Sequence, residues 1–375
     1  MKKDVIRYFM MGLLLAGGCG ESTPPADGED SQASDKADSA GSTKVIGSVT
    51  ETDLVADVTG VAGATDANLL NPWGIAFNSM GGAWISDNHS GLTTVYDSTG
   101  ALKLTVTIPA PMGATDPAAP SGQVANNVAT DFGGDKFIFV TEDGTVSGWQ
   151  PSTGAVLHVD NSSKSSNYKG VAIAQSSSGA RLFAAAFGTG TVDVLDNKYQ
   201  PVTCEGGFVD PNMAKGYAPF NIYSNGSVLL VSYARQDSEK GDDQAGAGHG
   251  FIDAFDTEGF FIQRVASRGV LNSPWGIAVA PASWGKLAGA LLVGNFGDGR
   301  INAWKMPSFS GYGSGATATR LGTIAGTNGK PLTIQNLWAV VFAPDAGGAN
   351  SSQLYFTAGT GGEEHGLFGR IQIAQ

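Results

Sequence analysis

Histidine is the side chain whose ordinary pKa best suits it to proton transfer near neutral pH, and this sequence contains only four. Three of them, His89, His249 and His365, lie one or two residues before a glycine that precedes a short apolar run. Glu363 lies close to His365, so the two are candidates for a general acid or base. Loop histidines without a chemical role would have the same spacing, and this alternative stays open.

A second candidate site comes from a hexapeptide that occurs twice. Asn71-Pro-Trp-Gly-Ile-Ala returns two hundred residues later as Ser273-Pro-Trp-Gly-Ile-Ala. Four weaker copies align with it, and together they define two rings of equivalent positions. The first ring is Trp73, Asn126, Lys169, Phe220, Trp275 and Trp338, and the second is Gly74, Asn127, Gly170, Asn221, Gly276 and Ala339.

These rings have two interpretations. The first is a ligand pocket with aromatic walls and polar Asn and Lys groups. The second is packing, in which glycine allows strands to converge and tryptophan fills the space between repeats. The packing interpretation suits the tryptophans, whereas Asn126, Asn127, Lys169 and Asn221 interrupt an otherwise apolar pattern.

The elements that must position these residues are short strands. The chain has 54 glycines and only 15% charged residues, and no window has the apolar spacing of an amphipathic helix. Three apolar runs and a variable fourth recur six times, with a glycine opening the third run at 91, 144, 190, 250, 299 and 366. This period predicts an all-β fold, a six-bladed β-propeller. A strand at 53–56 precedes the first repeat and is expected to pair into the last blade, which closes the ring.

The N-terminus has the pattern of an export signal. Lys2, Lys3 and Arg7 precede an apolar run at 8–16 that is too short to span a bilayer. The small residues before Cys19 resemble a bacterial lipobox, which implies a leader at 1–18 and a lipid on Cys19. Residues 19–48 then form a polar, acidic linker, and 49–375 form the propeller. This predicts an exported lipoprotein held by its lipid at the outer membrane, in the periplasm or at the cell surface, with ordinary secretion as the alternative.

The charge balance restricts the partners. The formal net charge is −12, which argues against nucleic acid and against anionic lipid, because those partners require clustered Lys and Arg. With Cys19 lipidated, Cys204 has no partner for an intramolecular disulfide. We expect a monomer.

Three consecutive segments carry a family resemblance: NLLNPWGIAF at 68–77, WISDN at 84–88 and GLTTVYDSTG at 91–100. They resemble a bacterial family of exported six-bladed propellers with the pattern N-P-W-G-I-A-F…S-D-N…Y-D-G-T-G. The wider repeat pattern is similar to NHL-repeat and gluconolactonase-type propellers. The resemblance covers about residues 50–373 and implies a fold and export, without an activity.

Gluconolactonase-type propellers hold a divalent cation in the channel, and this resemblance implies a Ca²⁺ site as a candidate. Asn127 and Asn221 lie near suitable positions, and Glu142 follows a second strand. Oxygen ligands of this kind suit Ca²⁺. No acidic residue falls in the two rings, however, and such residues after strands also serve as turn formers.

The expected function is binding at the channel mouth, of a small molecule, a glycan or an envelope protein. The alternative is a metal-dependent hydrolase of the lactonase or esterase kind. The Gly-x-Ser-x-Gly sequence of a nucleophile elbow is absent. Binding without catalysis is therefore favoured, although the sequence leaves catalysis open.

Overall fold

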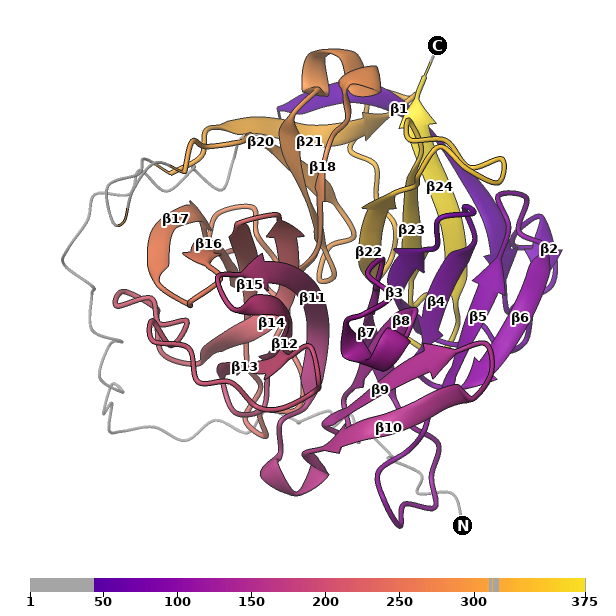
Figure 1. Cartoon of the computed structure of the whole chain (residues 1–375). Coiled ribbons are helices and arrows are strands. Elements are labelled where there is room, and N and C mark those ends of the chain that lie inside the picture. Colours follow the sequence, from indigo (N-terminus) through magenta and orange to yellow (C-terminus); the bar gives the residue numbers. More distant parts are fainter. Residues whose placement is uncertain (1–43, 310–311, 313–316, 375) are drawn as a thin grey trace, which may run out of the picture. The chain divides into compact units, whose positions relative to one another are not determined.

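The computed structural model describes residues 44–309, 312 and 317–374 (Figure 1). The predicted leader, Cys19 and the linker up to residue 43 lie outside the described residues. Ala37–Gln375 forms one compact unit. In the described part of the chain, no helix has the length and apolar character needed to span a bilayer.

The described strands form five sheets with antiparallel neighbours in sequence order, apart from the contacts of the first strand. Three sheets have four strands and one has three. Their strands are β3 (Pro72–Phe77), β4 (Ala83–Asp87), β5 (Leu92–Tyr96) and β6 (Leu102–Thr107); β7 (Pro120–Ala125), β8 (Phe137–Thr141), β9 (Thr145–Gln150) and β10 (Gly154–Asp160); β11 (Tyr168–Ser176), β12 (Gly179–Ala186) and β13 (Thr191–Asp196); and β14 (Tyr217–Asn225), β15 (Val228–Arg235), β16 (Gly250–Asp256) and β17 (Phe261–Ser267).

The fifth sheet has nine strands, because β1 joins two groups of strands. It contains β18 (Pro274–Val279), β19 (Ala290–Asn295), β20 (Ile301–Lys305) and β21 (Arg320–Gly326); β22 (Leu337–Phe342), β23 (Leu354–Ala358) and β24 (Leu367–Ile373); and β1 (Val45–Ala56) with β2 (Ala64–Thr65). Three short 3-10 helices complete the described elements: η1 (Phe132–Gly134), η2 (Ser162–Lys164) and η3 (Ala282–Leu287).

The inner strands form a ring in which β3, β7, β11, β14, β18 and β22 each contact the next, and β22 contacts β3. Glycine allows this convergence. A Cβ on Gly74 would lie 2.8 Å from the Ser121 carbonyl oxygen, and one on Gly276 would lie 2.6 Å from that of Trp338. The sheets are arrayed around this ring in Figure 1. The predicted all-β propeller is confirmed.

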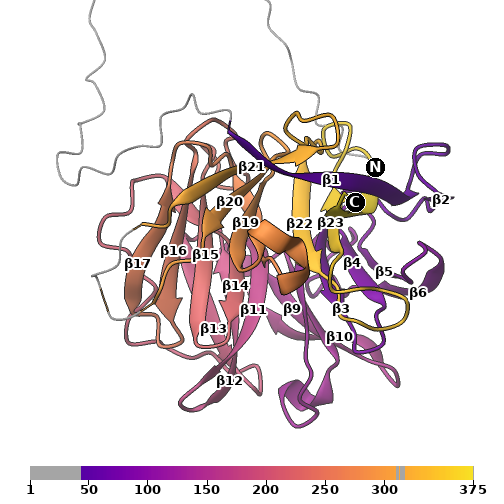
Figure 2. The ribbon, with the colours of Figure 1, turned by 90° about the horizontal axis from the view of Figure 1, so that it is seen from above.

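The first strand closes the ring as predicted. β1 pairs antiparallel with β24, with Val49 opposite Ile373 and Ala56 opposite Leu367. It also pairs in parallel with β21, which the sequence did not predict. Figure 2 shows β1 running across from β21 to the C-terminal strands. β1 begins at Val45, so it includes the end of the segment expected to be linker.

The alignment of the second repeat is wrong. Its inner strand is β7, Pro120–Ala125, and not the segment that starts at Asn126. In the second repeat, the position equivalent to Trp73 is therefore Ser121, and the position equivalent to Gly74 is Gly122. The error arose because β7 carries Gln123 where the other inner strands are apolar. Gln123 nevertheless belongs inside, because its amide donates to the carbonyl oxygens of Gly74, at 2.8 Å, and Trp84.

Candidate functional site

Aromatic side chains close one end of the inner-strand ring. Trp73 stacks on Trp338 with ring centroids 3.5 Å apart, and Trp275 meets both edge-on. Phe220 packs beside Trp338, with centroids 6.0 Å apart. All four are buried. The structure brings these predicted residues together, and their burial fits the packing interpretation of the tryptophans.

Lys169 is the charged centre of this end. Its side chain is only 1% exposed, and its ammonium contacts Glu142 and lies 3.1 Å from an Asp242 carboxylate oxygen. The ammonium also lies 5.1 Å from the Trp73 ring centroid, within cation–π range. Burial alone would lower the pKa of Lys169, but the attraction of Glu142 and Asp242 outweighs it and raises that pKa. Lys169 therefore stays charged inside the aromatic cluster.

Asn71, the first residue of the recurrent hexapeptide, ties the first repeat to the last. It is fully buried and has a φ of 44°, in the left-handed region. Its amide nitrogen donates to a Glu363 carboxylate oxygen at 3.0 Å, and its amide oxygen accepts from Trp338 Nε1 at 3.1 Å. The His89 ring nitrogen Nε2 lies 3.3 Å from the same amide nitrogen. Gly359 leaves room for this side chain, since a Cβ there would lie 2.2 Å from the Asn71 amide oxygen.

Two carboxyl groups near this end have pKa values close to neutrality. Burial raises the pKa of Glu363 to about 7, helped by repulsion from Glu142, Asp242 and Asp243 and opposed by the Asn71 hydrogen bond. Burial also raises the pKa of Asp243 to about 6, helped by Asp242 and opposed by Lys169. The carboxyl groups of two distant loops, after β15 and after β23, thus face the same region. We call Asn71, Glu142, Lys169, Asp242, Asp243 and Glu363 the charged mouth.

Two cavities flank the charged mouth. The outer one has a volume of about 530 Å³, and its lining includes Glu142, Asp143, Asn167, Glu239 and Lys240. This volume is typical of small-molecule sites. The inner one, about 100 Å³, lies in the channel among the ring glycines and Asn221.

The residues proposed for Ca²⁺ do not fit a metal. Asn127 is exposed at the far end of β7. Asn221 uses its amide oxygen to accept from the Ile222 backbone and its amide nitrogen to donate to the Trp275 carbonyl oxygen. Glu142 is committed to Lys169 and to Asn88, at 2.8 Å. Among the residues that the structure describes, no group of three or more His, Cys, Asp or Glu could hold a metal ion.

The residues proposed for acid–base chemistry point to different partners. His249 Nδ1 lies 2.7 Å from the Gln244 carbonyl oxygen, and His365 Nδ1 lies 2.8 Å from an Asp57 carboxylate oxygen. Glu363 instead bonds to Asn71 and does not pair with His365. Asn126, predicted in the ring, holds a turn at the opposite strand end by donating to the Asp131 and Asp135 carbonyl oxygens.

Sequence reasoning missed Asn71, Asp242 and Asp243. Asp242 and Asp243 lie in a polar segment that reads as an ordinary surface loop, and only the contact of Asp242 with Lys169 and the burial of Asp243 reveal a role. Asn71 carried a signal, because it stands where the second copy of the hexapeptide has serine.

Two viral proteins are similar along most of the chain. "Uncharacterized protein R648" of Acanthamoeba polyphaga mimivirus is 33% identical over 337 residues, which are 85% of this chain and 78% of the relative. "Uncharacterized protein L690" of the same virus is 30% identical over 339 residues, which are 85% of this chain and 84% of the relative. The chain belongs to the family of these mimivirus proteins. No family model matches the sequence, and the resemblance of this chain to a bacterial family of exported propellers stays a prediction.

Solved structures share the fold of this chain. Soluble aldose sugar dehydrogenase from Escherichia coli superposes with a TM-score of 0.56 at 14% identity, covering 87% of this chain and 100% of the other. Virginiamycin B lyase from Staphylococcus aureus superposes with a TM-score of 0.51 at 13% identity, covering 87% and 99%. At this identity the similarity concerns the fold alone.

Proposed function

We propose that this propeller binds a small, hydroxyl-rich ligand that carries a positive charge, in the outer cavity beside the charged mouth. The observation that carries the proposal is the excess of carboxyl groups at that cavity. Asp143 and Glu239 line it against one lysine, Lys240. Glu142 also lines it, and its charge is paired with Lys169 from the buried side.

The lining chemistry suits such a ligand. Carboxylates accept hydrogen bonds from hydroxyl and ammonium groups, and bonds to a charged partner are the stronger ones. The Asn167 amide oxygen is buried, without a hydrogen-bond partner of its own, at the same cavity. It supplies a further acceptor. An amino sugar has both required features. The alternative of a metal-dependent hydrolase has no fitting ligand set among the described residues.

Calorimetry with three matched sugars tests the ligand class. D-glucosamine carries the ammonium, D-glucose lacks it, and N-acetylglucosamine replaces it with a neutral amide. We expect glucosamine to bind about tenfold more tightly than the other two, as one charge-assisted contact would give. Glu239→Gln combined with Asp143→Asn should remove this preference, whereas Glu205→Gln, at another exposed glutamate, should not. Equal affinity for the three sugars, or no binding at millimolar concentration, would contradict the proposal.

We further propose that Cys19 carries a lipid that holds the propeller at a membrane outside the cytoplasm. The support is the sequence around Cys19 alone. Metabolic labelling with an alkyne fatty acid checks it: Cys19→Ser should abolish labelling and Cys204→Ser should leave it. Labelling of the Cys19→Ser protein would exclude this anchor.

A further inference from the structure

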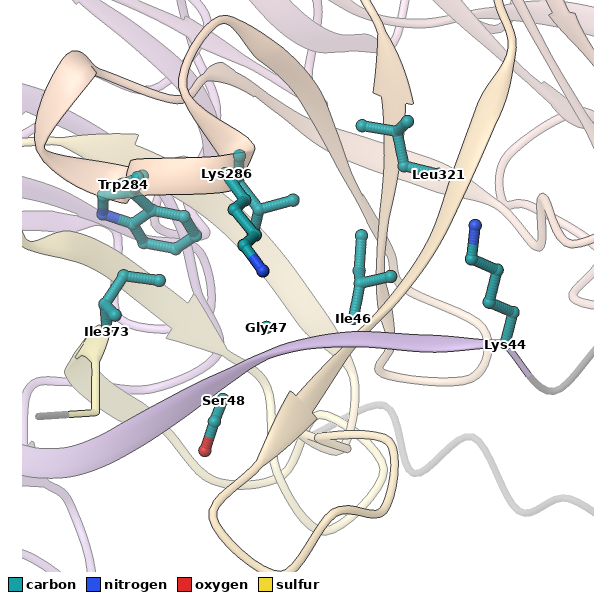
Figure 3. Close-up of a pocket in the computed structure, with 10 residues that line it drawn as sticks. Lys44, Ile46, Gly47, Ser48, Trp284, Lys286, Leu321 and Ile373 are labelled. Atoms are coloured by element: carbon teal, nitrogen blue, oxygen red, sulfur yellow. The ribbon is translucent and has the colours of Figure 1, made fainter.

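An apolar groove lies at the ring closure, away from the charged mouth. It has a volume of about 430 Å³ and lies between β1 and the η3 helix, with β21 and the end of β24 beside it (Figure 3). Its apolar lining comes from Ile46, Trp284, Leu287, Leu321 and Ile373. Figure 3 shows Ile46, Trp284, Leu321 and Ile373 around one space, each on a different element.

The backbone of β1 opens this groove. β1 and β21 are in register at Val45 and Ile46, lose it, and pair again at Val49. Within the irregularity, Gly47 has a φ of 65°, which favours glycine. A Cβ on Gly47 would lie 3.3 Å from Leu287 Cδ1, so the missing side chain leaves the space free. A β-bulge of this kind is a built feature of a sheet rather than a packing defect.

The charge of the groove is opposite to that of the protein. Lys44 and Lys286 line it, and no Asp or Glu does. In the described part of the chain neither lysine forms a salt bridge. In Figure 3 the Lys286 side chain extends toward Gly47, and Lys44 lies on the other side of Ile46. Two unpaired cations beside an apolar surface are unusual in a chain whose net charge is −12.

We propose that this groove binds a single-chain anionic amphiphile, such as a long-chain fatty acid. The alkyl chain lies along Ile46, Leu287, Leu321 and Ile373. Lys286, which extends toward Gly47, holds the carboxylate, and Lys44 adds positive charge on the other side of Ile46. The volume falls within the range of small-molecule sites, and binding would remove the alkyl chain from water. Because the groove spans β1 and β21, the ligand also stabilises the ring closure.

Titration with three amphiphiles of equal chain length, below their critical micelle concentrations, tests the head-group charge. Dodecanoate should bind and raise the melting temperature, while dodecyltrimethylammonium and dodecyl maltoside should bind at least tenfold more weakly. Lys286→Glu should weaken dodecanoate binding roughly fivefold or more, as expected for loss and reversal of one exposed ion pair. Lys198→Glu, at an exposed lysine in the turn after β13, should change nothing.

Substitutions that fill the groove test where the ligand binds. Leu321→Trp should abolish dodecanoate binding, whereas Leu104→Trp, at an exposed leucine of β6, should not. Should Leu321→Trp fail to fold, the Lys286→Glu result still decides. Equal binding of all three amphiphiles, absence of dodecanoate binding, or indifference to Lys286→Glu overturns the proposal. Light scattering of the same samples checks for a second copy as occupant, and a dimer that Lys286→Glu dissociates also overturns it.

Discussion

The two copies of the hexapeptide have nearly the same sequence and backbone but different surroundings. Asn71 and Ser273 are both fully buried and have φ values of 44° and 49°. Each lies beside an acid with a raised pKa, Glu363 for Asn71 and Asp243 for Ser273. Only Asn71 also bonds to Trp338 and contacts His89.

The tryptophans of the two copies differ in the same way. Trp73 offers its ring face to the Lys169 ammonium, whereas Trp275 donates from Nε1 to the Lys169 carbonyl oxygen at 3.1 Å. The shared residues Pro-Trp-Gly therefore build the ring, and the single different residue determines which groups the ring holds. The residues that the two copies share serve the fold, and the residue that differs determines the contacts of the site.

The largest effect on stability is expected from substitution of Lys169, which both copies of the hexapeptide contact. Lys169→Met leaves Glu142 beside a buried apolar side chain, and we expect a loss of about 3 kcal/mol in the free energy of unfolding, as for a broken buried ion pair. Urea denaturation measures it. Lys169→Met combined with Glu142→Gln should recover part of the loss, and Lys198→Met should be neutral. A neutral Lys169→Met would mean that Lys169 does not organise the two copies.

Next in size are the glycines that the copies share. Gly74→Ala and Gly276→Ala each place a Cβ within 2.8 Å of a neighbouring backbone oxygen, and overpacking of this kind costs about 2 kcal/mol. Equal losses in thermal unfolding would confirm that the shared residues are scaffold. The control is Gly241→Ala, which meets no atom within 4 Å. A loss at one copy alone would break the equivalence.

Substitution of Asn71, the residue that differs between the two copies, should have a smaller effect on stability. Asn71→Ser converts the first copy into the second and removes the bonds to Trp338 and Glu363, for a loss of about 1.5 kcal/mol. Losing the Asn71 hydrogen bond, which favours the ionised form, should also raise the pKa of Glu363 further. Carboxyl titration by NMR measures this shift. An unchanged pKa of Glu363 would show that Asn71 does not tune it.

The last effect concerns pH. The pKa of Glu363 is about 7 in the folded protein and 4.5 by its ordinary value, so the folded state holds the proton more tightly. The stability contributed by protonated Glu363 is complete below pH 4.5 and falls as the pH rises to about 7. Glu363→Gln should remove this fall, which is at most about 3 kcal/mol because each pKa unit corresponds to about 1.4 kcal/mol.

Stability measured across pH 4–8 tests this, compared with Glu51→Gln. Glu51 is a necessary comparison, because burial raises its pKa to about 7 as well. If Glu363→Gln leaves the pH profile of the wild type unchanged while Glu51→Gln flattens it, the charged mouth does not titrate near neutrality.

The repeats predicted the propeller because apolar strands and glycine turns recur with a local period. The second repeat failed at Gln123, whose polar side chain is satisfied by the backbone of the neighbouring strands. The ring residues were found for the same reason as the fold. The contacts that build the charged mouth were not found, because Asp242 and Glu363 reach their partners across 73 and 292 residues of chain, and no spacing in the sequence records such contacts.

The pairing of β1 with β24 has a consequence for synthesis. The strand made first cannot pair with its antiparallel partner until the chain has grown from Val49 to Ile373. At about 5–20 residues per second, that wait lasts on the order of tens of seconds, during which β1 offers an open strand edge to other chains. Glu363 and Asn71 meet across a similar length of chain. Nascent chains that stall before the last repeat therefore have neither a closed ring nor a complete charged mouth, and they are the species that chaperones must shield.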